Sequence, residues 1–175
     1  EIKLVRALHD PATVFDRFQH GRERFISYLH SSLLQKATSD NLVYHGLAGQ
    51  FFLQGVSHVL KVRILADMED RVNLEMARNR VNRKEAFSRL QQDDHERRQW
   101  SKHLFGVDTW DSSLYDMVLH VHNLNVDDVA KLICEAAQME QFRVTQKSQK
   151  VLDDLITAAN IRAKLVHNYP TVQVR

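Results

Sequence analysis

The segment QQDDHERRQW, residues 91–100, places two aspartates, a histidine, a glutamate and two arginines at consecutive positions. If this segment is helical, steps of four and three from Ala86 and Leu90 place Asp94 and Arg97 on the same face. If that face points inward, a carboxylate and a guanidinium there need a ligand or each other, because burying an unpaired charge is costly. Arginine suits phosphate because its planar fork donates two hydrogen bonds and keeps its charge. The spacing is therefore compatible with a phosphate site.

The same spacing also fits a solvated helix. In that alternative Asp93–Arg97 and Asp94–Arg98 are surface ion pairs four residues apart. Each such pair stabilises a helix by only about 0.2–0.5 kcal/mol. Spacing alone does not decide between the two interpretations.

The sequence predicts no metal site. Asp93 to Glu96 are consecutive, and consecutive side chains on a helix point apart rather than converge. His120 and His122 would share one face of a strand, but the sequence places no third ligand beside them.

Two further groups of residues have both a functional and a structural interpretation. Four arginines fall within thirteen residues, after a predicted strand that ends in an acid, and they form either a solvated basic face or a set that closes over polyphosphate: Arg71, Arg78, Arg80 and Arg83. Cys134, the single cysteine, has apolar neighbours in a predicted helix, and we expect it in the core.

The elements that must position these residues are mostly helices with a few short strands. Residues 58–67 alternate apolar and polar side chains and predict the clearest strand. Asn82 and Asn125 are expected to cap helices. The other expected elements are a helix from Asp10 to about Thr38, a short strand at Leu42–Tyr44, a helical stretch from Glu69 to about Leu104, a strand at 116–122, a helix after Asn125 with Val126, Val129, Ile133 and Ala137 on one face, a helix from Lys147 to about His167 and a last strand after Pro170.

Helices that alternate with short strands predict the α/β class with a small, mostly parallel sheet. The chain has 175 residues and a formal net charge of +2. It therefore lacks the strongly basic surface expected of a nucleic-acid or membrane partner. No apolar run reaches the roughly 18 residues of a membrane helix, and a single cysteine suits a reducing compartment. We therefore expect a cytoplasmic protein.

The order of several motifs resembles the cytidylate-kinase-like family of nucleoside monophosphate kinases over roughly Asp10 to Ala137. The most specific parts are Asp94-x-x-Arg97, the FGVD and DSSLYDMVLH segments, and the VDDVAKLI helix. The resemblance implies a P-loop kinase core, in which a parallel sheet is flanked by helices and a mobile lid supplies arginines. Such enzymes transfer the γ-phosphoryl group of ATP, with magnesium, to CMP or a related monophosphate.

The resemblance also implies roles for individual residues. Arg97 would hold the transferring phosphate, and Asp94 would orient it or contact the acceptor nucleotide. Four other positions would bind substrate or phosphate, the first at the end of a strand and the others in the lid: Gly46, Arg71, Arg78 and Arg80.

The sequence departs from the family pattern in two places. The family's first strand and P-loop precede the region of resemblance, and Leu47 stands where the family commonly has arginine. We therefore expect residues 1–140 to form a kinase-like core that lacks the P-loop. Residues 141–175 would be an appendage, faintly similar to the start of a BON-type domain. An exposed sheet edge in such a core would favour a homodimer.

These departures leave two functions open. The first is a nucleoside monophosphate kinase-like phosphotransferase, whose catalysis would need a P-loop that this chain does not show. The second is a catalytically inactive nucleotide-sensing or regulatory module of the same fold. Both would bind a nucleoside monophosphate, with CMP favoured.

Overall fold

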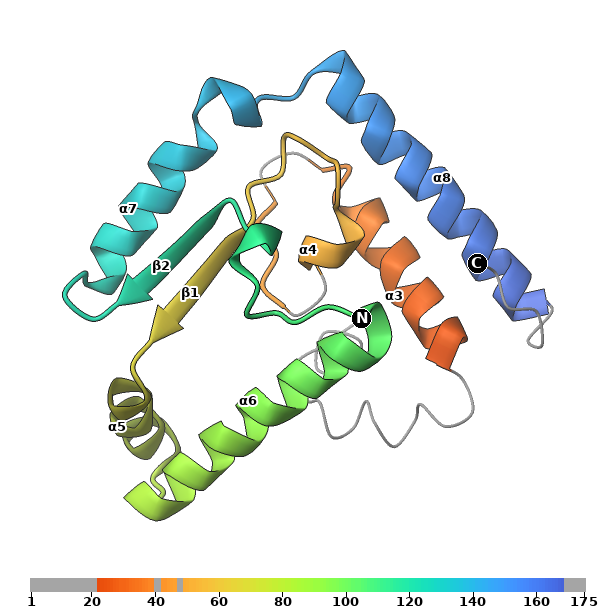
Figure 1. The fold of residues 1–175 in the computed structure, drawn as a ribbon. Helices are drawn as coiled ribbons and strands as arrows, with labels where there is room; N and C mark the ends of the chain where they lie inside the picture. Colours follow the sequence, from red (N-terminus) through yellow and green to blue (C-terminus); the bar gives the residue numbers. More distant parts are fainter. Residues whose placement is uncertain (1–21, 40–41, 47–48, 169–175) are drawn as a thin grey trace. The chain divides into compact units, whose positions relative to one another are not determined.

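A computed structural model describes residues 22–39, 42–46 and 49–168 (Figure 1). It is a helix-rich α/β structure with a small two-stranded parallel sheet. The elements, in chain order, are α3 (Arg22–Lys36), α4 (Gly49–Phe52), β1 (Val62–Ala66), α5 (Met68–Asn79), α6 (Arg83–Phe105), the 3-10 helix η1 (Ser112–Leu114), β2 (Met117–Val121), α7 (Val126–Ala137), the 3-10 helix η2 (Glu140–Phe142) and α8 (Gln146–Asn168).

The chain forms two compact units. The first comprises Glu1–Val59 with Val144–Arg175, and the second comprises Leu60–Arg143. The expected division into 1–140 and 141–175, with a BON-like start in the second part, stays a prediction. In the structure α8 packs on α3 within the first unit.

The first unit has an apolar core between α3, α8 and the segment after α4. Five buried residues form it: Leu34, Leu53, Val56, Leu152 and Ala159. Polar contacts at the edge join the same two helices, since Ser31 Oγ donates to Asn160 Oδ1 at 2.6 Å. This unit is therefore held together by apolar packing between segments more than 100 residues apart in the sequence.

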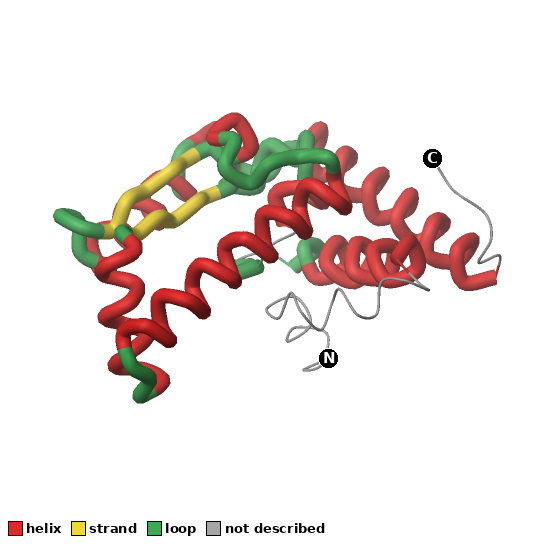
Figure 2. The backbone as a smooth tube through the Cα atoms, turned by 60° about the horizontal axis from the view of Figure 1, so that its bottom comes forward, coloured by secondary structure: helices red, strands yellow, loops and turns green. Residues whose placement is uncertain are grey.

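The second unit is built around the parallel pair of strands, drawn in yellow in Figure 2. Their register pairs Val62 with Met117 and Ala66 with Val121. Both strands therefore end at the same edge, as parallel strands joined by a helical crossover do. The crossover consists of α5 and α6, and α7 contacts β2 (Figure 1).

Local signals account for both ends of α6 and for the start of α7. Asn82 Oδ1 accepts the Glu85 amide at 3.0 Å, and Asn125 Oδ1 accepts the Asp128 amide at 2.9 Å. Both predicted N-caps are thus confirmed. Gly106 ends α6 with φ 69°, a left-handed conformation that glycine adopts without a steric cost.

The strands at β1 and β2 and their parallel pairing are also confirmed. The expected strand at Leu42–Tyr44 is wrong, because residues 42–45 have neither strand nor helix structure. The first half of the predicted helix after Asp10 and the strand after Pro170 lie outside the described residues. None of the described helices combines enough length with enough apolar character to cross a membrane.

The expectation that Cys134 lies in the core is wrong, because its side chain is exposed. The buried side chains of α7 are Val129 and Ala136, while Val126 is 71% exposed. Cys134 is five residues beyond Val129, which places it roughly 140° around the helix from that residue. Only a narrow stripe of α7 is therefore covered.

Candidate functional site

Arg71 on α5 and Asp94 on α6 form a two-pronged ion pair. Arg71 Nη1 donates to Asp94 Oδ2 at 2.7 Å, and Nη2 donates to Oδ1 at 2.8 Å. Their side chains are 28% and 32% exposed, so the pair is partly shielded from water. The hydrogen bonds that Arg71 donates to Asp94 raise the pKa of Arg71. This geometry fixes the plane of the guanidinium group as well as its position.

Asp93 and Arg97 lie beside this pair on α6. Burial raises the pKa of Asp93, and the charge of Arg97 lowers it in part. Ala86 and Ser101 are buried and Leu90 is half-buried, as expected for the inward face of α6. Arg97 is exposed, so it does not lie on that inward face. It presents its charge to solvent next to a half-buried carboxylate.

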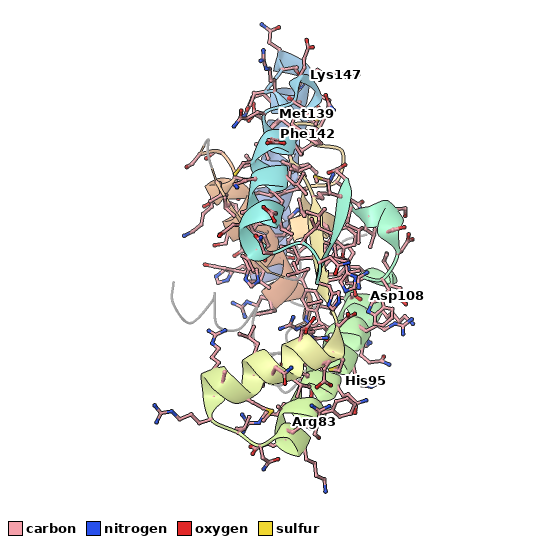
Figure 3. All side chains as sticks on the ribbon, turned by 90° about the vertical axis from the view of Figure 1, so that its left-hand side faces the viewer. Arg83, His95, Asp108, Met139, Phe142 and Lys147 are labelled. Carbon is pink, nitrogen blue, oxygen red and sulfur yellow. The ribbon has the colours of Figure 1, made fainter. Side chains whose placement is uncertain are left out.

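Arg98 forms an ion pair with Asp108 in the loop after α6. Its Nε donates to Asp108 Oδ2 at 2.9 Å and its Nη2 donates to the same oxygen at 2.6 Å. Asp108, labelled in Figure 3, also accepts the Trp110 amide at 3.1 Å. The alternative surface pairing of Asp94 with Arg98 is therefore wrong, because each has a partner on a different element.

The Asp108 interactions should stabilise the fold in a pH-dependent way. Hydrogen bonds from Arg98 and the Trp110 amide hold the pKa of Asp108 at about 2 instead of its ordinary 3.8. A depressed pKa in the folded state means that this stabilisation is complete above about pH 4 and is lost as the pH falls to about 2. Asp108→Asn should therefore lower the melting temperature at pH 7 and make less difference at pH 2. Thermal unfolding followed by circular dichroism at both pH values tests this.

The matched control for that experiment is Asp127→Asn, which removes an exposed carboxylate on α7. A difference between wild type and Asp108→Asn that is the same at pH 7 and pH 2 would contradict the expected dependence.

A second group of charged side chains lies at the carboxyl edge of the sheet. His120 Nε2 lies 3.1 Å from Asp67 Oδ1, and His122 Nδ1 lies 3.4 Å from Asp67 Oδ2 and 3.0 Å from Asp70 Oδ2. The hydrogen bond to Asp70 and the charge of Asp67 raise the pKa of His122. Two imidazoles thus meet two carboxylates from another part of the chain.

The other predicted site residues do not join the Arg71–Asp94 pair. Arg78 is exposed in the last turn of α5, and Arg80 ends that helix in the left-handed conformation with φ 55°. Gly46 lies in the first unit, where a Cβ atom would approach the Tyr44 hydroxyl to 2.3 Å. A larger residue at position 46 would therefore require the Tyr44 ring to move. Leu47 lies outside the described residues.

Sequence reasoning missed the partner of Asp94 and the group at the sheet edge. The second omission could have been avoided, since Asp67 directly follows β1 and His122 directly follows β2. Carboxyl ends of neighbouring parallel strands meet at one edge, and this is where α/β proteins place ligands.

These observations describe an α/β protein whose arginine-bearing helices α5 and α6 connect two parallel strands. A comparison with protein-family models matches residues 3–123 to the cytidylate kinase-like family. The chain belongs to this family. The matched region contains all of α3 through β2, including Asp94 and Arg97. Searches of curated proteins and of solved structures found no match.

Proposed function

We propose that this chain binds a nucleoside monophosphate, with CMP favoured, through the arginines of α5 and α6. We further propose that the site serves phosphoryl transfer from ATP–Mg²⁺ and that β1, β2 and their helices belong to a P-loop kinase core. The observation that carries the proposal is the two-pronged Arg71–Asp94 pair next to the exposed Arg97. Membership in the cytidylate kinase-like family supports it.

The proposed roles follow from what each side chain contacts. Asp94 holds Arg71 in one orientation, so little conformational entropy remains to be lost when Arg71 meets a ligand. Arg97 is exposed and acts on Asp93 through its charge. An incoming phosphate would compete with Asp93 for Arg97, and the phosphate dianion is the stronger partner because it carries two negative charges and the carboxylate carries one. Arg78 and Arg80, both exposed, would contribute as mobile lid residues.

The residues of this chain do not fit the usual triphosphate cradle. The 175 residues contain no G-x-x-x-x-G-K-[ST] loop, whose amides and lysine bind the phosphates of ATP. ATP–Mg²⁺ would supply the γ-phosphoryl group in the proposed reaction. The side chains of Arg71, Asp94 and Arg97 would instead serve the acceptor monophosphate.

A second candidate function is nucleotide sensing without catalysis. It is favoured by Leu47, which stands where the family commonly has an arginine near the monophosphate. An aliphatic side chain there removes one cation that would neutralise the developing charge of the transferring phosphate. Binding of the monophosphate could survive that loss while transfer does not.

Calorimetric titration with CMP, UMP, AMP and ATP–Mg²⁺ tests the proposal. We expect CMP to bind and Arg97→Ala to weaken that binding by about 10–100-fold. Hydrogen bonds to charged groups contribute about 1.5–3 kcal/mol, and about 1.4 kcal/mol is a factor of ten in affinity. The matched control is Arg89→Ala on the same helix. Arg89 is exposed and forms an ordinary pair with Glu85 at 2.6 Å, so its removal should leave the affinity unchanged.

A transfer assay with ATP–Mg²⁺ and CMP then separates the two functions. Turnover would support the phosphotransferase, whereas binding of CMP without turnover would support the sensing module. Equal effects of Arg97→Ala and Arg89→Ala would contradict the proposed phosphate role of Arg97. If none of the four nucleotides binds, both functions are wrong for this chain.

A further inference from the structure

We propose that Asp67, Asp70, His120 and His122 form a binding site for a first-row divalent transition metal such as Zn²⁺. The site lies at the carboxyl edge of the sheet and is separate from the Arg71–Asp94 pair. This metal site does not depend on the proposed nucleotide function.

Three of the four proposed ligands already have donor atoms with the spacing of a coordination shell. Ligand atoms of Asp67, Asp70 and His122 all lie within 4.8 Å of one another. The nitrogens of His120 and His122 lie 3.0–3.4 Å from the nearest carboxylate oxygens, including His120 Nε2 to Asp67 Oδ1 at 3.1 Å. Tetrahedral zinc with bonds of about 2.0–2.1 Å needs donors roughly 3.3 Å apart. A small ion therefore fits between the donor atoms of Asp67, Asp70 and His122, and His120 would join the shell after a shift of its side chain.

The backbone accounts for this convergence. The strand register pairs Leu65 with His120 and Ala66 with Val121. Asp67 and His122 are the next residues along their chains, so both lie just beyond the last strand pair. Alternation along a strand directs His120 and His122 to the same face, and their rings lie 6.2 Å apart with an angle of 24° between their planes.

Asp70 joins from the first turn of α5. The proposed ligands thus come from the ends of two hydrogen-bonded strands and from the first turn of one helix. In contrast to consecutive acids on a helix, Asp67, Asp70 and His122 bring their ligand atoms within 4.8 Å of one another, and His120 approaches the other carboxylate oxygen of Asp67.

The ligand chemistry selects the class of ion. Imidazole nitrogens favour zinc and its first-row neighbours, whereas Mg²⁺ and Ca²⁺ favour shells made entirely of oxygen. Two imidazoles with two carboxylates therefore fit a transition metal better than magnesium. The four side chains are 48–54% exposed, which leaves room for water to complete the shell. A bound ion would also join the start of α5 to the end of β2 (Figure 1).

The test is a calorimetric titration of the full chain with ZnCl₂ and, separately, with MgCl₂. We expect one Zn²⁺ site that is lost or weakened about 100-fold in His122→Ala and in Asp70→Asn. Replacing outer-shell partners alone costs about 10–100-fold in metal affinity, and a direct ligand should cost at least as much. The matched control is His95→Ala, an exposed histidine on α6 that is labelled in Figure 3. Its affinity for Zn²⁺ should equal that of wild type.

Co²⁺ absorption spectra supply a readout that does not depend on activity, because visible bands report the ligands and geometry around the ion. Their loss in His122→Ala, with an unchanged circular dichroism spectrum, would support the site. Equal Zn²⁺ affinity in wild type and both variants would overturn it. Binding of Mg²⁺ in preference to Zn²⁺ would overturn the proposed class of ion. Since no nucleotide is present, these results do not depend on whether CMP binds.

Discussion

Trp100→Ala is expected to lower the free energy of unfolding by about 3–5 kcal/mol, the cost typical of removing a buried tryptophan. Trp100 is 3% exposed, and its ring lies 5.5 Å from that of Phe105 on the same helix. Alanine would leave a cavity that the surrounding helix fills only in part. Urea unfolding followed by far-ultraviolet circular dichroism measures the change without relying on tryptophan fluorescence.

The chain provides its own control, because its other tryptophan is at the surface. Trp110 is 60% exposed, and its ring lies 5.0 Å from the Arg98 guanidinium. A cation–π contact at an exposed site contributes about 0.5–1 kcal/mol, so Trp110→Ala should cost far less. A similar cost for both substitutions would show that Trp100 is not in a close-packed core.

Leu152→Ala is expected to lower the free energy of unfolding by about 2–5 kcal/mol. Leu152 on α8 is 1% exposed and belongs to the core of the first unit, with Leu34, Leu53 and Val56. Close packing makes the cavity costly, because the lining atoms lose contacts that water cannot replace. Urea or thermal unfolding, followed by circular dichroism, measures the loss.

Leu165→Ala is the matched control on the same helix. Leu165 is 38% exposed, so its substitution removes the same atoms from a site that water already reaches. We expect its cost to be well under half that of Leu152→Ala. An equal loss in both variants would mean that α8 is stabilised by its own helix propensity rather than by its contact with α3.

Both proposed sites lie in the second unit and include residues in or beside α5, but these residues contact different elements in the two sites. Arg71 and Asp94 join the middle of α6 to α5. Asp67 and Asp70, at the start of α5, approach the end of β2 instead. Because the two groups share no residue, the Zn²⁺ and CMP titrations can be interpreted independently.

Local features of this protein follow from the sequence by itself. The N-caps at Asn82 and Asn125 each join a side-chain oxygen to a backbone amide three residues later. Both partners of each hydrogen bond are therefore present in the local sequence. The strands β1 and β2 are visible in their alternation, and their order around helices predicts parallel pairing. Family membership is also a property of the sequence, and the motifs around Asp94 and Arg97 indicate it.

Contacts between distant segments were decided only by the tertiary structure. Asp94 had three arginines within reach in principle, and the crossing of α5 over α6 selected Arg71 rather than Arg97 or Arg98. The apolar neighbours of Cys134 predicted a core position. In the structure only the stripe of α7 that contains Val129 and Ala136 is buried, and Cys134 lies outside this stripe.

The group at the sheet edge likewise depends on contacts between distant segments. His120 and His122 share a face because of strand alternation, which the sequence predicts. Their meeting with Asp67 depends on a strand register that joins residues more than 50 positions apart. Helices and their caps are set by hydrogen bonds within a few residues, whereas strand register and the convergence of side chains depend on how whole elements pack.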